Sequence, residues 1–404
     1  MGMLRLFLAY VVVLFHSPEG VLPRPIHPAL AVQCFYVISG FYMQLIIKSY
    51  HDANDNKWAL TFYKSRFVRI FSIYYVFLLL TFALNFKFDF PTLSLFVKNH
   101  DFVEALIVIA NNVLIFGQSV LRLFFYDLDA GKFVFVDTYK NLIPITNKAS
   151  FTMMMMSWTL DVELMFYLIA PLILLRSSSM ILAITFLSIS LRLWLGHNGY
   201  NQHTWLYGFF PLEIATFLLG SISCRFYLFF THKKYKNILE YISPKISFLI
   251  NNAFYKRILK FLHQQHNSKI LFHLIYFVIA FNLFNFYLSG WNESISGGSW
   301  DGGITGAPHK YWYVIFVTAL WLPILFFLTK DMKWDRFIGN LSYPVYLGHG
   351  LALYYLHTSK VEPQYHGMVA FVATALLSIL VVILLENPVD RYRHKKFLRN
   401  SSTA

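Results

Sequence analysis

Charged residues are scarce in this sequence. They make up 13% of its 404 residues, about half of the roughly 25% that is usual in soluble globular proteins. Hydrophobic residues make up 57%, and this share excludes both an ordinary soluble enzyme and a disordered chain. Since a helix needs about 20 apolar residues to cross the hydrocarbon core of a bilayer, the composition indicates a polytopic membrane protein that lies in the lipid bilayer.

Cysteines and acidic residues are also few. The two cysteines, Cys34 and Cys224, both lie in apolar stretches, so we expect no disulfide framework. Lysine and arginine outnumber aspartate and glutamate by 34 to 20. In a membrane protein this excess is typical of cytoplasmic loops that face anionic lipid head groups, so we expect no nucleic-acid partner.

Eleven apolar stretches mark the candidate membrane segments. They cover approximately residues 4–22, 29–48, 67–86, 102–125, 153–175, 178–195, 205–229, 270–289, 311–329, 341–357 and 367–386. Segments 48–66, 231–269 and 391–404 are rich in lysine and arginine, which predicts that all three are cytoplasmic. Both flanks of 102–125 are then outside, so this stretch is predicted to be re-entrant or interfacial. We therefore predict an all-α bundle of about ten transmembrane helices with both termini cytoplasmic, formed by one membrane domain, 1–390, before the basic tail.

Ionisable residues inside the apolar stretches are functional candidates, because each costs about 2.5–3.5 kcal/mol to insert. Arg5 and His16 lie in the first stretch, and their spacing of nearly three helical turns places them on one face, about 16 Å apart along the axis. A packed, hydrogen-bonded histidine is the alternative interpretation of His16. Arg66 and Arg69 share a helix face and suit phosphate binding, although the positive-inside rule alone also accounts for them.

Asp161 and Glu163 are carboxylates in the fifth stretch, near the expected depth of His16. Residues two apart on a helix point about 200° apart, so at most one of these carboxylates can face His16. A carboxylate beside an imidazole is a general-base arrangement, and a structural ion pair is the alternative. Glu213 and His349 are further intramembrane candidates for lining a substrate pocket.

The predicted outer loop 290–310 is rich in glycine but lacks the motif of a phosphate-binding loop. Trp300 and the neighbouring acidic residues suit either a sugar-stacking platform or an ordinary flexible loop. His263 and His266 have the helical spacing of metal ligands. A third ligand is lacking, so we expect no metal site.

Six motifs together resemble the acyltransferase-3 family of integral membrane acyltransferases. They are Arg5–x10–His16, Phe35-Tyr36-Val37-Ile38-Ser39-Gly40-Phe41, Arg66-x-x-Arg69, Ser157 to Tyr167, Ser342-Tyr343-x-x-Tyr346-Leu347-x-His349 and Glu386-Asn387-Pro388. Thr159 stands where the family motif usually has serine, and Asp161 adds an acid that the motif does not require. The resemblance implies transfer of an acyl group, most often acetyl, from cytoplasmic acyl-CoA. The acceptor is usually a sugar hydroxyl of a bacterial surface polysaccharide, such as O-antigen or capsule, or of its lipid-linked precursor.

The resemblance also implies roles for the candidate residues. Arg5, Arg66 and Arg69 are expected to bind acyl-CoA, and His16 to act as general base or acyl carrier beside Glu163 or Asp161. The expected substrate-binding residues are Ser39, Trp158, Tyr167, Glu213, His349 and Trp300. If the source is bacterial, the expected location is the inner membrane. A gradient-driven transporter or exporter remains the main alternative, because intramembrane histidine, glutamate and arginine also build transport sites.

Overall fold

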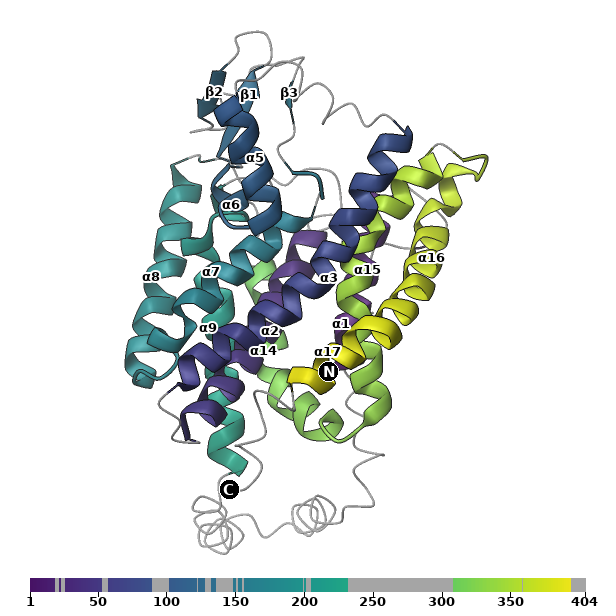
Figure 1. The fold of residues 1–404 in the computed structure, drawn as a ribbon. Helices are drawn as coiled ribbons and strands as arrows, with labels where there is room; N and C mark the ends of the chain where they lie inside the picture. Colours follow the sequence, from purple (N-terminus) through teal and green to yellow (C-terminus); the bar gives the residue numbers. More distant parts are fainter. Residues whose placement is uncertain are drawn as a thin grey trace, which may run out of the picture.

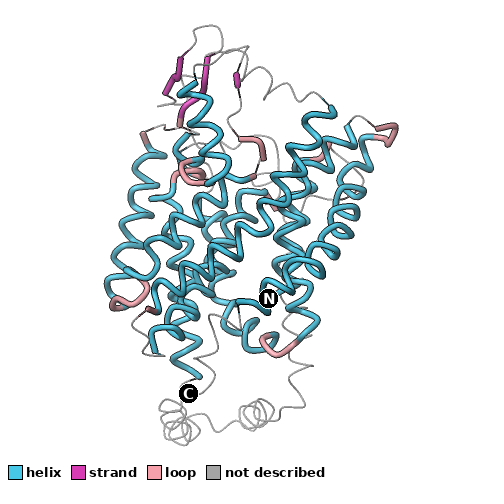
Figure 2. The backbone as a smooth tube through the Cα atoms, in the orientation of Figure 1, coloured by secondary structure: helices cyan, strands magenta, loops and turns pink. Residues whose placement is uncertain are grey.

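The protein folds into one bundle of helices that stand side by side (Figure 1, Figure 2). The structure, a computed structural model, describes residues 1–18, 22, 26–52, 57–88, 102–121, 123–127, 132–135, 148–149, 152–154, 156–198, 200, 205–231, 308–357 and 359–393. The expected membrane stretch 270–289, His263, His266, Trp300 and most of the basic tail lie outside these residues.

The bundle is built from helices of 15 to 31 residues. They are α1 (Gly2–His16), α2 (Pro28–Asp52), α3 (Trp58–Phe88), α7 (Ser157–Ile173), α8 (Ser178–His197), α9 (Phe210–Thr231), α14 (Pro308–Thr329), α15 (Lys333–His357) and α16 (His366–Val381). A π-helical turn, Val382–Glu386, joins α16 to α17 (Asn387–Arg393). In Figure 1 the N-terminus and α17 lie at the lower end of the bundle, and a small sheet lies at the upper end.

Six helical segments among the described residues are long and apolar enough to cross a membrane. They are Pro28–Asp52, Trp58–Leu84, Ser178–His197, Phe210–Phe229, Trp312–Thr329 and Pro363–Arg393. Large apolar side chains also face outwards, for example Phe186 and Leu384, each 73% exposed, as expected for a surface that lipid covers. The predicted helical membrane protein is therefore confirmed, whereas ten crossings and cytoplasmic termini stay predictions.

The stretch 102–125 does not form one continuous helix. Helix α5 (Phe102–Leu114) has 13 residues, about 20 Å at 1.5 Å per residue, which is shorter than the roughly 30 Å hydrocarbon core. The positive φ angles of Ile115 and Gly117, 67° and 89°, then turn the chain into the short helix α6 (Gln118–Leu121). Its re-entrant or interfacial placement stays a prediction.

A three-stranded antiparallel sheet follows α6, which the all-α prediction did not include. Strand β1 (Phe124–Asp127) pairs with β2 (Lys132–Phe135) and with β3 (Lys148–Ala149). The residues of β1 and β2 are mainly aromatic or β-branched, which favours strands. Their local preference explains why the helical pattern ends before residue 124.

Two glycines allow α2 and α9 to touch backbone to backbone. A Cβ atom added at Gly40 would lie 1.9 Å from the carbonyl oxygen of Phe217, and one added at Gly220 would lie 1.8 Å from that of Val37. Only glycine permits so close an approach, as in the small-residue contacts of membrane helices. This crossing fixes the rotation of α2 next to Ser39.

Helix α1 is anchored on α15 at the lower end of the bundle. The Asp335 carboxylate accepts hydrogen bonds from the backbone N–H groups of Gly2, at 2.8 Å, and Met3, at 3.0 Å. A Cβ atom added at Gly2 would lie 1.7 Å from the Asp335 carbonyl oxygen. The carboxylate thus satisfies amide groups that have no partner within α1, and it fixes α1 against α15.

Candidate functional site

A cavity of about 440 Å³ lies between α1, α2, α3, α7, α14 and α15 and reaches the π-helical turn and α17. Six of the residues predicted for the site line it: Arg5, Ser39, Arg66, Arg69, Glu163 and Tyr167. They come from four helices that are far apart in the sequence. The structure therefore brings together the predicted cofactor-binding arginines, one of the two candidate carboxylates and two of the expected substrate-binding residues.

Five basic side chains line this cavity. Arg5, Arg66 and Arg69 line it together with Lys330 and Arg336. The guanidinium of Arg69 repels those of Arg5 and Arg66, and Arg66 is buried with its Nε atom unpaired among the described residues. Cations that repel one another and have unused donors are suited to bind an anion such as a phosphate.

Four acidic residues also line the cavity: Glu163, Asp335, Glu386 and Asp390. Glu163 is held by two hydroxyl groups, because Ser39 Oγ and Tyr167 OH both donate to its Oε1 atom, at 2.6 and 2.5 Å. Tyr167 lies one turn further along α7, and Ser39 lies on α2 beside the Gly40 crossing. Glu163 thus joins α2 to α7 at the cavity wall.

His16 is oriented by a backbone carbonyl group, which sequence reasoning did not predict. Its Nδ1 atom lies 2.8 Å from the carbonyl oxygen of Val12. A carbonyl oxygen only accepts hydrogen bonds, so Nδ1 carries the proton, and the Nε2 atom of the neutral ring keeps its lone pair. The Val12 carbonyl group thus orients the His16 ring, and the roles predicted for Glu163 and Asp161 beside His16 stay predictions.

A second histidine lies beside His16. The ring centroids of His16 and His349 are 5.2 Å apart. Tyr346 links this pair to the cavity, since it is one of the lining residues and its ring centroid lies 6.0 Å from that of His349. The Tyr346 hydroxyl also shares a hydrogen bond of 2.9 Å with Thr159 Oγ1. His349, predicted to bind substrate, is thus a neighbour of His16, next to the cavity wall.

Asp161 makes a structural contact, and its predicted catalytic role stays a prediction. Its carboxylate accepts hydrogen bonds from the Ser119 N–H, at 2.7 Å, the Ser119 Oγ, at 2.5 Å, and the Gly117 N–H, at 3.0 Å. These donors belong to the turn that begins α6, and Asp161 is absent from the described residues that line the cavity. Asp161 and Glu163 do point to different partners, as their spacing requires.

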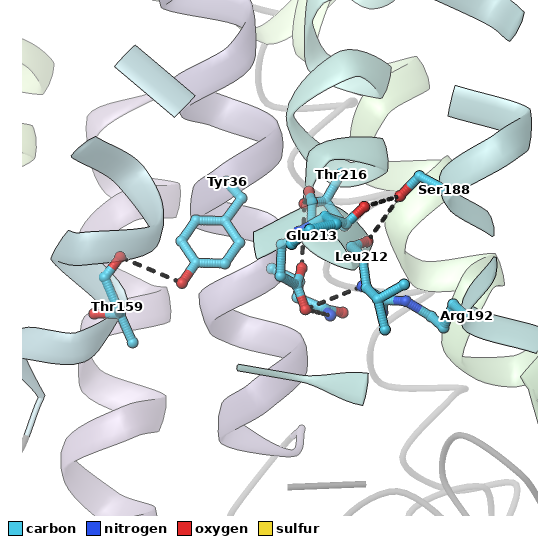
Figure 3. A network of polar contacts seen from close by, with 9 residues as sticks. Tyr36, Thr159, Ser188, Arg192, Leu212, Glu213 and Thr216 are labelled. Carbon is cyan, nitrogen blue, oxygen red and sulfur yellow. Dashed lines mark hydrogen bonds and ion pairs between the residues drawn. The ribbon is translucent and has the colours of Figure 1, made fainter. Parts of the chain in front are cut away.

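Glu213 lies in a buried polar network between α2, α8 and α9 (Figure 3). It accepts a hydrogen bond of 2.6 Å from Gln33 Nε2 and lies 3.1 Å from Arg192 Nη2, with both charged side chains at most 1% exposed. Arg192 Nη2 also donates to the Leu212 carbonyl oxygen, at 2.6 Å. This network ties three helices together, and the described cavity lining does not include Glu213.

Trp158, another expected substrate-binding residue, packs edge-on against Tyr207 with ring centroids 4.9 Å apart and is 6% exposed. It is not among the described residues that line the cavity. The binding roles of Trp158 and Glu213 therefore stay predictions, and the structure gives each of them a packing or ion-pair contact.

Glu386 lines the cavity, and it was named from the sequence only as part of a family motif, without a role. It is 4% exposed, and its Oε2 atom has no hydrogen-bond partner among the described residues. It ends the π-helical turn Val382–Glu386, a local geometry that is frequent at functional sites. An acidic residue at the end of an apolar stretch is costly to insert into a membrane, and this cost could have identified Glu386 as a candidate.

Comparison with known proteins gives one match. A family model described as an acyltransferase domain matches residues 1–387. No curated protein and no solved structure matches the chain. The matched region contains every residue that lines the cavity except Asp390.

Proposed function

We propose a specific reaction for this protein, because the chain belongs to the acyltransferase-3 family and is a membrane acyltransferase. It transfers an acetyl group from cytoplasmic acyl-CoA to a saccharide hydroxyl. The acceptor is an extracytoplasmic or lipid-linked saccharide, and the location in a bacterium is the inner membrane. The observation that supports this proposal most directly is the meeting of Arg5, Arg66 and Arg69 in one cavity.

The arginine cluster is the proposed binding site for the phosphates of acyl-CoA. Guanidinium groups bind phosphate oxygens through paired, charge-assisted hydrogen bonds, and the unpaired Nε atom of Arg66 is one donor for such a bond. The volume of about 440 Å³ is within the usual range of roughly 300–1,000 Å³ for small-molecule sites. The phosphates lie near α17 in this arrangement, and the thioester extends towards Tyr346.

His16 supplies the proposed chemistry through its Nε2 atom. As a general base, Nε2 takes the proton of the acceptor hydroxyl while the oxygen forms a bond to the acyl carbon and the carbon–sulfur bond breaks. The proton then passes to the departing thiolate, and CoA leaves as the free thiol. As an acyl carrier, the same lone pair forms a bond to the acyl carbon, the carbon–sulfur bond breaks, and the ring gives its proton to the thiolate, so that CoA leaves as the free thiol. The acceptor oxygen then takes the acyl group from the ring nitrogen, and the hydroxyl proton returns to the ring.

These two roles of His16 differ in one measurable intermediate. Protein incubated with radiolabelled acetyl-CoA and no acceptor gains a stoichiometric protein-bound label if His16 carries the acetyl group. A general base gives no label under the same conditions, while acetyl transfer begins as soon as acceptor is added.

Mass spectrometry of surface polysaccharides and their lipid-linked precursors tests the function. A host that lacks the gene is given the wild type, His16→Ala or the control His51→Ala, which changes a side chain that is 53% exposed at the end of α2. We expect one acetyl mass increment with the wild type and the control, and none with His16→Ala. An increment with all three proteins refutes the role of His16 but not acyl transfer. No increment with any of them, when all are present in the membrane, refutes the proposed acceptor.

The buried pair of Arg192 and Glu213 is the observation that favours a transporter as the second candidate, because paired intramembrane charges mark proton and substrate pathways. A transporter requires an ion gradient, whereas acyl transfer requires acyl-CoA. Activity of the purified protein in detergent, where no gradient exists, therefore supports the acyltransferase.

A further inference from the structure

The Nε2 atom of His349 is a buried acceptor that the fold leaves unused. The side chain is 0% exposed, and Nε2 has no hydrogen-bond partner among the described residues. Its Nδ1 atom lies 2.7 Å from the carbonyl oxygen of Tyr346, so Nδ1 carries the proton and Nε2 of the neutral ring has the lone pair. Buried polar atoms are almost always paired, and one that is not needs an explanation.

The neighbouring ring of His16 explains why the His349 Nε2 atom is left unpaired. His16 and His349 each donate Nδ1–H to a carbonyl group of their own helix, so both neutral rings have the same tautomer. Their centroids are 5.2 Å apart. Among the described residues, the titratable groups at His349 are His16 from α1 and Tyr346 from its own helix, and neither is a carboxylate.

His349 is also held tightly against the rest of the bundle. A Cβ atom added at the next residue back, Gly348, would lie 2.7 Å from Phe77 Cε1, so α15 lies close against α3 here. At the far end of α15, Asp335 fixes α1. The distance between the two rings is therefore set by two anchored helices.

We propose that His349 is a positioning residue for acyl transfer, which stabilises the positive charge that His16 acquires when its Nε2 takes the proton of the acceptor hydroxyl. This inference rests on the proposed function of His16 as general base. The Val12 carbonyl group already accepts from Nδ1 of His16, and the neutral His349 ring adds an unused nitrogen lone pair beside the new imidazolium ion. The proton stays on His16 until the carbon–sulfur bond breaks, and it then passes to the CoA thiolate, so that the net reaction yields ester and free thiol.

Two opposite substitutions distinguish this role from packing. His349→Phe keeps an aromatic ring but has no acceptor atom, whereas His349→Gln loses the ring but has an amide oxygen near the position of Nε2. If His349 only fills space, the phenylalanine variant is the more active of the two. If it stabilises charge, the glutamine variant is the more active.

His366 is the matched control. It is 3% exposed, its Nε2 lies 2.9 Å from the Val361 carbonyl oxygen, and its Nδ1 is unpaired among the described residues. Its ring lies beside His357, and it has no place in the proposed mechanism. The same two substitutions at His366 measure the effect of replacing any buried histidine near the upper end of the bundle.

The experiment measures kcat and the KM for acetyl-CoA with purified full-length variants that elute as folded protein. We expect His349→Phe to lower kcat by roughly 10- to 100-fold, the effect of losing a hydrogen bond to a charged group. We expect His349→Gln to recover at least half of that loss on a logarithmic scale. The KM for acetyl-CoA stays within about twofold, because the arginine cluster is unchanged, and neither His366 variant loses more than threefold in kcat.

Two other results overturn the inference. Equal activity of His349→Phe and wild type, or higher activity of His349→Phe than of His349→Gln, shows that the lone pair is not used. A failure of the proposed function looks different, because wild type, His16→Ala and both His349 variants then all lack acetyl transfer. Retention of activity by His16→Ala likewise refutes the proton-transfer step and, with it, the role of His349.

Discussion

Replacing Gly40 by alanine is expected to destabilise the bundle more than any ordinary glycine-to-alanine change. The new Cβ atom would lie 1.9 Å from the carbonyl oxygen of Phe217, and real Cβ contacts are essentially never under 3.0 Å. Helices α2 and α9 must therefore separate by about 1 Å or more at their crossing. Both contact atoms belong to helix backbones, so no side-chain rotation relieves the clash.

The magnitude follows from what the separation breaks. Two buried hydrogen bonds join α2 and α9 on either side of the crossing: Gln33 to Glu213, at 2.6 Å, and Ser221 to Gln44, at 2.7 Å. An added separation of about 1 Å takes both beyond the usual hydrogen-bond distance. Overpacking alone costs about 1–3 kcal/mol, and a lost bond to a charged group costs about 1.5–3 kcal/mol. We therefore expect a total loss of at least about 3 kcal/mol in the free energy of unfolding.

Gly350→Ala is the matched control for this prediction. Gly350 also lies inside a helix, but no atom lies within 4 Å of an added Cβ, so this change gains roughly 0.5–1 kcal/mol from helix propensity. Thermal unfolding in detergent, followed by the fraction that elutes as monodisperse protein, measures both variants. Unfolding of Gly40→Ala at the temperature of the wild type refutes the close packing of α2 and α9.

Two further predictions concern the cavity and the anchor of α1. Arg69→Ala is expected to raise the KM for acetyl-CoA by roughly 10-fold or more, because a charged donor is lost. The control Arg391→Ala changes an exposed residue of α17 and should leave this KM unchanged. Steady-state assays measure both variants. Asp335→Asn is expected to lower stability by about 1.5–3 kcal/mol at pH 7, because asparagine keeps one acceptor oxygen and loses the hydrogen bond to the other, charged oxygen. Burial alone would raise the pKa of Asp335, but hydrogen bonds from the first turn of α1 hold it below its usual value. This stabilisation is present above the unfolded pKa of about 3.9 and is lost as the pH falls through the lower folded pKa. The thermal unfolding temperatures of the two proteins should therefore differ at pH 7 and converge as the pH falls below that folded pKa.

The meeting of the three arginines was predictable from the sequence because helix geometry limits where they can lie. Arg66 and Arg69 share a face by their spacing, and Arg5 lies near the start of α1, which runs in the same direction as α3. The partner of each carboxylate was not predictable in this way. Glu163 accepts a hydrogen bond from Ser39, and Asp161 accepts one from the turn that begins α6. These partners depend on the rotation of α7, which tertiary packing sets and the residue pattern within α7 does not.

The orientation of His16 was missed for a different reason. Its partner is the carbonyl group of Val12, and every residue carries a carbonyl group, so no pattern of residue types indicates this bond. The small sheet was missed because strands of two to four residues are shorter than any window in which a hydrophobic period is readable. Backbone partners and very short elements are thus decided by the fold.

The two proposed chemical functions lie at opposite ends of one helix. Arg5 lines the cavity near the lower end of α1, and His16 ends the same helix beside His349, about 16 Å further along the axis. A straight helix keeps this separation constant, so in the proposed reaction the base stays at a set distance from the donor phosphates and CoA itself need not cross the membrane. The Asp335 contact fixes α1 along its axis, and it therefore positions both groups at once. An anchor more than 10 Å from the reacting atoms thus belongs to the site as much as the residues that line the cavity.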